Sequence, residues 1–183
     1  LRVPFIAGWP GRIKPGPVSH QLMSSVDLMA TFAAMVGRKL GENEGRDSIS
    51  MLAALTEDSE VPLRNEMIVS PSKPSHVGMR KGEWMYIPAK SDGGFNGSKP
   101  SDHAWGGAAV TTLVNTPNSD IVNGKIKPGA PPAQLYRLDT DVNQTTNLYK
   151  EKPEVVSEMD ALLKASRKAT APTRPATKRK KKP

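Results

Sequence analysis

The side chains that could do chemistry are few and widely spaced along this chain of 183 residues. It contains three histidines, His20, His76 and His103, and no cysteine. The lack of cysteine excludes disulfides, thiolate metal ligands and cysteine nucleophiles within the chain. The histidines lie too far apart in sequence to predict a local metal site. His20 lies beside an extended segment, and we expect it to be structural.

The segment DTDVNQ is a second candidate, because it offers oxygen ligands at alternate positions, Asp139, Asp141 and Asn143. A calcium loop of the EF-hand type also requires a glycine at its sixth position and a bidentate acid at its twelfth. The chain has Gln144 and Lys150 at those positions. We therefore interpret the segment as a turn and predict no metal site in it.

Positive charge is concentrated at one end of the chain. The formal net charge is +8, and residues 170–183 hold six lysines and arginines and no acid, so the remainder carries only +2. The Pro-, Thr- and Lys-rich composition predicts a disordered basic tail over residues 169–183. The nearly neutral body argues against nucleic acid as a partner, and so does a tail without aromatic residues to stack on bases. No apolar run approaches the roughly 20 residues of a transmembrane helix.

Hydrophobic periodicity predicts two kinds of element in the first third of the chain. The apolar run at residues 3–7 predicts a strand buried on both faces, which needs neighbouring strands. A helix is predicted over residues 27–36, with Asp27 as its cap and Gly37 as its left-handed stop. A short helix is predicted after Asp47. The residues predicted to face the core are Leu28, Phe32, Met35 and Val36 in the first helix and Ile49, Leu52 and Leu55 in the second.

Residues 61–168 predict a small α+β subdomain. Strands are expected at 65–70, 76–80 and 83–89, the last two forming a hairpin in which Gly82 takes a positive φ. A further strand is expected at 133–139, and an amphipathic helix over 152–169 closes the subdomain. Residues 90–131 are rich in Gly, Pro, Asn and Ser and predict a long loop, with one strand at 109–114. The helix residues predicted to be buried are Val156, Met159, Leu162 and Leu163.

Four segments, in this order and spacing, resemble a known family. They are LRVPFIAGWPGRIKPG at 1–16, SSVDLMATFAAMVG at 24–37, GMRKGEWMYI at 78–87, and QLYRLDTDVNQTTNL at 134–148 followed by PEVVSEMDALL at 153–163. Together they resemble the C-terminal third of a sulfatase of the alkaline-phosphatase-like superfamily. The chain departs from the family pattern at Ala30 and Val142, where proline is usual, and at Gln144, where glutamate is usual.

The resemblance covers residues 1–168 and implies an α/β fold of the alkaline-phosphatase-like sulfatase kind. Residues 1–60 would be the C-terminal end of the catalytic α/β domain, containing the end of its large sheet. Residues 61–168 would be the small C-terminal α+β subdomain, with antiparallel strands and a closing helix. The resemblance is compatible with a secreted or extracytoplasmic location.

The resemblance also implies hydrolysis of sulfate esters with a formylglycine nucleophile and a calcium ion. In the family, the residues for both precede the segment that begins at Leu1, so we expect a missing N-terminal catalytic part to supply them. The motif candidate SEVPLR, from Ser59 to Arg64, has one residue too many between Ser and Pro for the C/S-x-P-x-R pattern. We assign no catalytic residue, metal ligand or cofactor to this chain, and we predict that the isolated chain is inactive.

Substrate contacts are the remaining role that the resemblance implies, because loops of the C-terminal subdomain line the substrate entrance in this family. His103 and Trp105, in the long loop, suit a sulfated sugar or an aryl sulfate, one by hydrogen bonding and the other by stacking. Lys73, His76 and Arg80 are cations that a sulfate ester would attract. The alternative for each is a surface residue without such a role.

A second hypothesis comes from a different class of protein. The small sheet could be the scaffold of a stand-alone basic module, in which the tail and the loop at 90–131 bind an acidic polysaccharide or nucleic acid through salt-sensitive attraction. A sulfatase reading frame upstream of Leu1, with the C/S-x-P-x-R motif and paired aspartates, would decide for the first hypothesis. Its substrate would be a sulfate ester, such as a sulfated polysaccharide.

Overall fold

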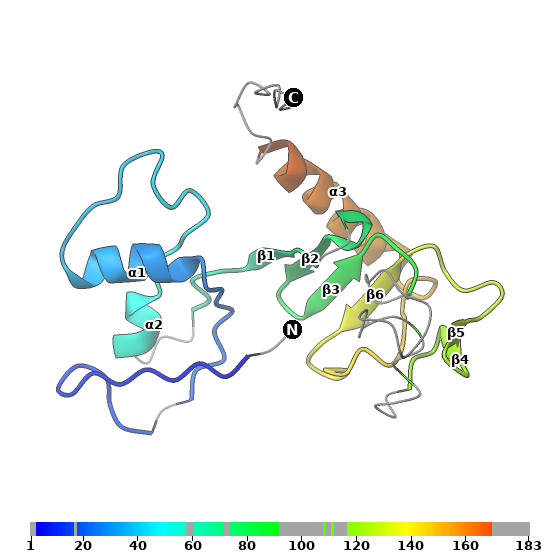
Figure 1. The fold of residues 1–183 in the computed structure, drawn as a ribbon, viewed down its shortest axis with the longest axis horizontal. Helices are drawn as coiled ribbons and strands as arrows, with labels where there is room; N and C mark the ends of the chain where they lie inside the picture. Colours follow the sequence, from blue (N-terminus) through cyan, green and yellow to red (C-terminus); the bar gives the residue numbers. More distant parts are fainter. Residues whose placement is uncertain are drawn as a thin grey trace, which may run out of the picture. The chain divides into compact units, whose positions relative to one another are not determined.

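The computed structural model describes residues 3–16, 18–57, 61–71, 74–91, 108, 111 and 117–169. The chain forms two compact units, Leu1–Met67 and Ile68–Pro183. Among the described residues, no helix is long and apolar enough to cross a membrane. The elements in chain order are α1 (Asp27–Met35), α2 (Leu52–Thr56), β1 (Glu66–Val69), η1 (Pro74–His76), β2 (Gly78–Lys81), β3 (Trp84–Ile87), β4 (Ile121–Val122), β5 (Lys125–Ile126), β6 (Gln134–Arg137) and α3 (Pro153–Ala169) (Figure 1).

The prediction of a buried strand at residues 3–7 is wrong for this structure. These residues run as an irregular segment, and Val3 and Ile6 are 82% and 93% exposed. A strand requires hydrogen-bonded neighbours, and no described strand pairs with this segment. The apolar run therefore lies on the surface of the first unit.

Helix α1 forms where it was predicted, but its buried side differs from the prediction. It ends one residue early, and Gly37 adopts φ +69° as expected for the helix stop. Phe32 and Val36 are 57% and 77% exposed, whereas Asp27 and Thr31 are fully buried. The buried face is selected by polar bonds, because the Thr31 hydroxyl accepts the backbone N–H of Met51 at 2.9 Å. The apolar stripe does not determine which face points inward.

The second unit contains strands β2, β3 and β6 of a four-stranded sheet whose order is β1-β2-β3-β6. Strands β2 and β3 form the predicted antiparallel hairpin, with Met79 opposite Tyr86 and Gly82 at φ +53°. Strand β6 returns from more distant sequence to pair antiparallel with β3, with Leu135 opposite Tyr86. Alternate side chains of these strands share one face, which creates the floor of a core.

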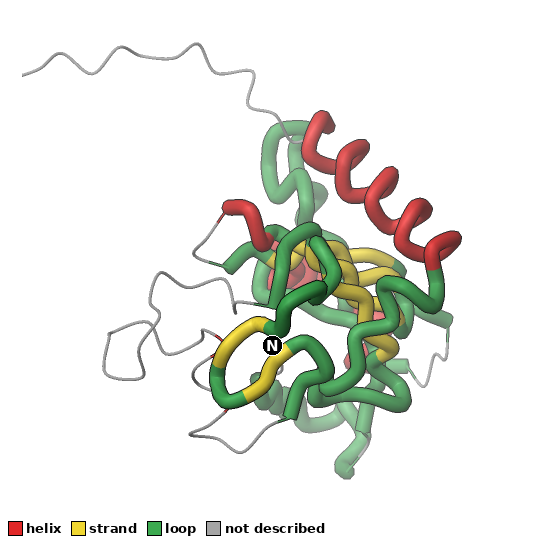
Figure 2. Tube along the Cα trace, turned by 90° about the vertical axis from the view of Figure 1, so that its right-hand side faces the viewer, coloured by secondary structure: helices red, strands yellow, loops and turns green. Residues whose placement is uncertain are grey.

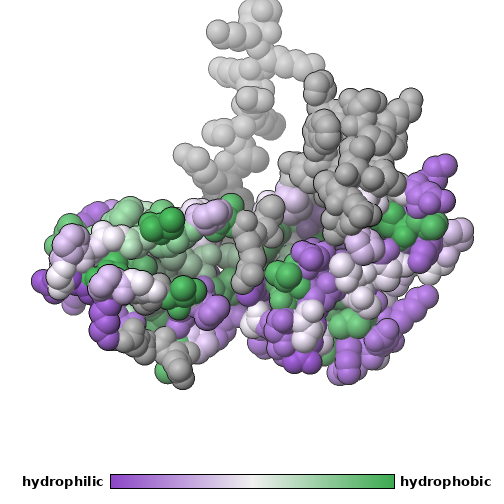
Figure 3. Space-filling view, turned by 90° about the horizontal axis from the view of Figure 1, so that it is seen from below, coloured by the Kyte–Doolittle hydropathy of each residue, from purple (hydrophilic) through white to green (hydrophobic). Residues whose placement is uncertain are grey.

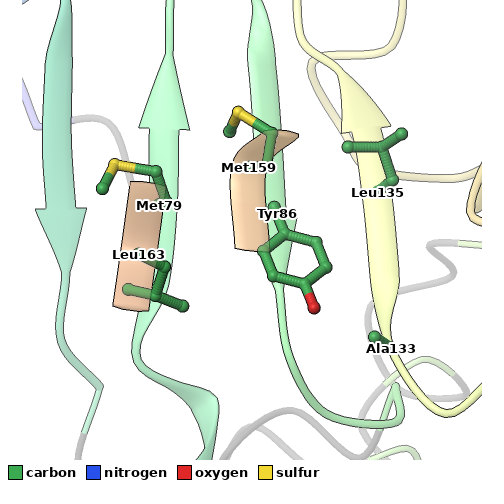
Figure 4. Close-up of a cluster of buried hydrophobic side chains, with 6 residues drawn as sticks. All are labelled: Met79, Tyr86, Ala133, Leu135, Met159 and Leu163. Carbon is green, nitrogen blue, oxygen red and sulfur yellow. The ribbon is translucent and has the colours of Figure 1, made fainter. Parts of the chain in front are cut away.

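Helix α3 covers that face and completes the core, as the sequence predicts. Figure 2 shows the helix running alongside the strands. Met159 and Leu163 are each 1% exposed and pack on the sheet residues Met79, Tyr86 and Leu135 (Figure 4). Both helix residues belong to the predicted apolar stripe, so this part of the fold is encoded locally.

The loop expected at residues 90–131 contains a small hairpin that the sequence analysis missed. Strands β4 and β5 pair antiparallel around Asn123 and Gly124, which both have positive φ values, 48° and 69°. An Asn-Gly pair between two strands is a strong hairpin signal. The strand predicted at 109–114 lies outside the described residues except for Thr111, which is in a 3-10 turn.

Candidate functional site

Three of the four predicted substrate-contacting residues, His103, Trp105 and Lys73, lie outside the described residues. The fourth, His76, is in η1 and is 6% exposed. Its Nδ1 lies 3.0 Å from Ser75 Oγ, and its Nε2 lies 3.3 Å from the carbonyl oxygen of Lys90. The imidazole therefore links η1 to the point where the predicted loop at 90–131 begins. Arg80, in β2, donates from Nε to the carbonyl oxygen of Gly82 at 3.2 Å.

A buried polar group joins two distant points of the predicted loop at 90–131, one just after β3 and one just before β4. We call Ser91, Asp120 and Asn147 the Asp120 cluster; all three side chains are buried. Ser91 Oγ and Asn147 Nδ2 both donate to Asp120 Oδ2, each at 2.6 Å. Ser91 comes shortly after β3 and Asp120 directly before β4, 29 positions later. One carboxylate oxygen thus joins the two ends of the intervening segment.

Asn147 connects this cluster to the edge of the sheet. Its Oδ1 accepts the backbone N–H of Leu135 at 2.9 Å and that of Tyr149 at 3.0 Å. Its Nδ2 also donates to the carbonyl oxygen of Ala133 at 3.1 Å. A buried amide is costly unless its donors and acceptors are paired, and here both kinds are used. The amide therefore extends the hydrogen bonding of β6 to the cluster.

A second row of polar groups runs beside the cluster. Asn118 Nδ2 donates to Tyr136 Oη at 3.0 Å, and Tyr136 Oη donates to Gln134 Oε1 at 2.9 Å. Gln134 Nε2 donates in turn to the carbonyl oxygen of Ala89 at 2.8 Å. Burial raises the pKa of the Tyr136 phenol, and the nearby charge of Asp120 adds to the increase. The phenol therefore stays protonated near neutral pH and acts as a hydrogen-bond donor.

The segment DTDVNQ is a turn, as the sequence analysis favoured. Asp141 Oδ1 accepts the backbone N–H of Thr145 at 2.8 Å, and its Oδ2 accepts that of Thr146 at 2.9 Å. Burial would raise the pKa of Asp141, but these hydrogen bonds outweigh it and hold the pKa below its ordinary value. Asp139 pairs with Arg137, with Oδ1 3.1 Å from Nε. The carboxylates of Asp139 and Asp141 are therefore bonded to other groups of the protein itself.

The described residues do not fit the cofactors that the resemblance implies. No group of three or more His, Cys, Asp or Glu side chains in this part of the chain could hold a metal ion. The sequence has no cysteine that could become formylglycine. Arg64, which ends the segment SEVPLR, binds Asp27 through its Nε at 3.0 Å and through Nη2. Its guanidinium is therefore part of an internal ion pair.

That ion pair is the centre of a second buried polar group, in the first unit. Asp27 is fully buried, and its carboxylate also accepts the backbone N–H groups of Ser24 and Ile49, both at 2.9 Å. Arg64 Nη2 also donates to the carbonyl oxygen of Asp47 at 2.7 Å. These bonds join α1 to two later segments of the same unit. They define a structural centre, because every polar atom of Asp27 is directed to the protein itself.

Comparison with known proteins shows which proteins this chain is similar to. No protein-family model matches the chain. An N-acetylgalactosamine-6-O-sulfatase of Bacteroides thetaiotaomicron is 28% identical over 164 residues, which are 90% of this chain and 27% of that protein. The matched region is a C-terminal part of the relative. The chain corresponds to the C-terminal part of a sulfatase.

Two further comparisons agree with this identification. Human arylsulfatase A is 39% identical over 77 residues, which are 42% of this chain and 15% of that protein. A solved sulfatase structure, from work on the metabolism of glycosaminoglycans by Bacteroides thetaiotaomicron, matches with a TM-score of 0.60 and 25% identity. That match covers 87% of this chain and 28% of the solved one. The chain thus spans about a quarter or less of the length of these sulfatases.

The comparisons confirm the predicted family and the predicted alkaline-phosphatase-like α/β fold class. They give no support to the alternative of a stand-alone basic module. The sequence analysis missed the Asp120 cluster of this sulfatase region. One signal was available, because Asn147 lies in the segment QLYRLDTDVNQTTNL, which carries part of the family resemblance. Ser91 and Asp120 carry no comparable local signal.

Proposed function

We propose that the whole protein is a sulfatase that hydrolyses sulfate esters of sugars, including those of a sulfated polysaccharide. The observation that carries this proposal is the match to the N-acetylgalactosamine-6-O-sulfatase over 90% of the chain. Pig and human N-acetylgalactosamine-6-sulfatases also match, at 39% and 37% identity over 57 residues. Relatives that act on a sulfated amino sugar favour the same class of substrate for this protein.

The catalytic groups would come from a preceding part of the protein. A sulfate ester requires a nucleophile to attack sulfur and a cation to stabilise negative charge on oxygen. Formylglycine and calcium would supply these functions in the whole enzyme, as the family resemblance implies. We assign this chain scaffold and substrate-contacting roles, because among its described residues no group of His, Cys, Asp or Glu side chains could hold the metal ion.

Residues 1–60 would complete the catalytic domain, residues 61–168 would form the C-terminal subdomain, and residues 169–183 would be a basic tail. The first unit supports this division, because several of its large apolar side chains are exposed. Phe5 is 52% exposed and Phe32 57% exposed. We propose that these side chains belong to an apolar patch, because a large apolar patch on a protein surface marks an interface. The preceding catalytic part is the partner that this proposal assigns to them.

His103 and Trp105 would contact the sugar that carries the sulfate, and Lys73 would attract the sulfate group itself. His76 would contribute differently, because its ring is buried and bonded to the carbonyl oxygen of Lys90. We assign it the role of holding the start of the loop that bears His103 and Trp105.

The test is sulfate release by the full-length protein from a 6-sulfated N-acetylgalactosamine and from a small aryl sulfate, with and without a calcium chelator. We expect release from both substrates, and its loss on chelation. His103→Ala or Trp105→Ala should lower kcat/KM for the sulfated sugar more than for the aryl sulfate, because contacts remote from the reacting group affect only substrates that reach them. His20→Ala, at an exposed histidine of the first unit, is the matched control. Equal effects on both substrates would contradict the assigned contacts.

A further inference from the structure

The tip of the β4–β5 hairpin carries an asparagine followed by a glycine. Asn123 and Gly124 join Val122 of β4 to Lys125 of β5, and both have positive φ values, 48° and 69°. We infer that Asn123 is a modification site, at which the side-chain amide is lost spontaneously and the residue becomes aspartate or isoaspartate. The co-reactant is water, and the reaction is independent of the proposed function.

The reaction requires the backbone nitrogen that follows an asparagine to reach the carbonyl carbon of its side chain. The nitrogen of Gly124 attacks Cγ of Asn123, a C–N bond forms, and the bond from Cγ to the side-chain nitrogen breaks. The proton of the Gly124 N–H leaves with that nitrogen as ammonia, and a cyclic imide remains. Water then adds to one imide carbonyl group and opens the ring, which gives aspartate or isoaspartate. Because the reacting groups belong to neighbouring residues, their effective concentration is high.

Asn123 meets these requirements better than the other described asparagines. It is the described asparagine that glycine follows, and glycine has no Cβ to hinder the approach of its nitrogen. Asn123 is exposed, and among the described residues no hydrogen bond holds its side-chain amide or the Gly124 N–H. Asn147, in contrast, is buried and its amide is hydrogen-bonded. Asn143 is also exposed, but it is followed by Gln144.

The hairpin controls how often the reactive geometry forms. The imide ring contains the Cα–C bond of Asn123, and a tight hairpin turn restrains rotation about that bond. Strands β4 and β5 have two residues each and form a sheet of their own. Such a hairpin is marginally stable, and its base is held where the Lys127 N–H donates to the carbonyl oxygen of Asp120 at 2.8 Å. Opening of the tip is therefore a local event of low free energy.

The first experiment incubates the full-length protein in mildly alkaline buffer and follows Asn123 by site-resolved mass spectrometry. A synthetic peptide of residues 118–128 represents the open hairpin, and Asn143 in the same sample is the matched control. We expect Asn123 to convert at a rate within about tenfold of the peptide, because a marginal hairpin opens readily. Asn143 should convert at least about tenfold more slowly, because the side chain of the next residue hinders ring closure. Equal rates at the two asparagines, or an unchanged Asn123 while the peptide converts, would overturn the inference.

Two substitutions separate the chemistry from the hairpin. Asn123→Gln keeps the amide but lengthens the side chain, so the ring closes less readily and conversion should fall at least about tenfold in both protein and peptide. Ile126→Ala removes the partner of Ile121 across the hairpin, so conversion should accelerate about twofold to fivefold in the protein and stay unchanged in the peptide. An unchanged rate for Asn123→Gln would refute the assigned attack. An unchanged protein rate for Ile126→Ala would refute control by the hairpin.

Discussion

At the centre of the first unit lies the ion pair between Asp27 and Arg64, whereas at the centre of the second lies a packed apolar core. In the first unit the fully buried side chains include Asp27 and Thr31, and polar bonds join its segments. In the second unit Leu135 and Met159 are buried between the sheet and α3. The second unit therefore has the usual source of stability of an independent subdomain, and the first depends more on specific polar bonds.

The surfaces of the two units also differ, because large apolar side chains are exposed mainly on the first unit. Phe5, Ile6 and Phe32 are exposed on the first unit, whereas on the described surface of the second unit the large apolar side chains that are exposed are Val122 and Val142. In Figure 3, hydrophobic residues are visible at several places on the first unit, and the visible residues of the second unit are mostly hydrophilic. The exposed apolar side chains of the first unit are the ones that our proposal for residues 1–60 assigns to contact with the preceding catalytic part.

The largest effect is expected from breaking the ion pair of the first unit. Arg64→Ala leaves the fully buried carboxylate of Asp27 without its cation, which should lower the free energy of unfolding by about 3–5 kcal/mol. Residue-resolved amide exchange should show the loss in residues 24–51 and no loss in β2, β3 and β6. Arg38→Ala is the control, because its pair with Glu44 is exposed, at 58% and 40% of the two side chains, and should change stability by at most about 1 kcal/mol.

The complementary change is made in the core of the second unit. Leu135→Ala removes a fully buried side chain and should lower the free energy of unfolding by about 2–5 kcal/mol. Amide exchange should then accelerate in β3, β6 and α3 and not in α1. Val142→Ala, at a half-exposed position of the same unit, should have little effect. Equal acceleration in both units would show that they unfold as one and would contradict the comparison.

The proposed interface of the first unit can be tested by comparing one substitution in the isolated chain and in the full-length protein. In the isolated chain Phe32→Ser should change the free energy of unfolding by about 0.5 kcal/mol or less, because Phe32 is on the surface. In the full-length protein we expect a loss of about 1.5–3 kcal/mol, because the phenyl ring would be buried against the catalytic part. Thermal unfolding of both proteins measures the difference, and the same small effect in each would count against the proposed interface.

The smallest effect on stability is expected when the pH is lowered far enough to protonate Asp27. Burial would raise the pKa of Asp27, but the bonds from Arg64, Ile49 and Ser24 outweigh it, so the folded pKa lies below the ordinary 3.8. The stabilisation is therefore fully present above pH 3.8 and is lost as the pH falls through the lower folded pKa. Amide exchange of α1 between pH 6 and pH 2 should accelerate in this window, and Asp27→Asn should reduce that dependence. If Asp27→Asn leaves the pH dependence of amide exchange in α1 unchanged, other groups are responsible for that dependence.

These differences also explain which features the sequence could predict. Met159 and Leu163 are on a stripe of helical period, and the β2–β3 hairpin turns at Gly82, so neighbours in sequence determine both. The β4–β5 hairpin was predictable in the same way from Asn123 and Gly124, and it was overlooked because the surrounding composition favours a loop.

The buried face of α1 and the Asp120 cluster were not predictable, because distant partners determine them. Asp27 is 37 positions from Arg64, and Asp120 is 29 positions from Ser91 and 27 from Asn147. In sequence, a single Asp or Ser in a region rich in Gly and Pro has the properties of a turn former. Only the fold shows that these side chains are buried and bonded to one another.

The central claim is that this chain is a structural and substrate-contacting part of a sulfatase whose catalytic groups precede it. The most direct measurement is sulfate release from an aryl sulfate with added calcium, by the chain of residues 1–183 alone and by the same chain co-expressed with the preceding segment of its gene. The account predicts no release by the isolated chain, and both release and improved solubility on co-expression. Turnover by the isolated chain would contradict it.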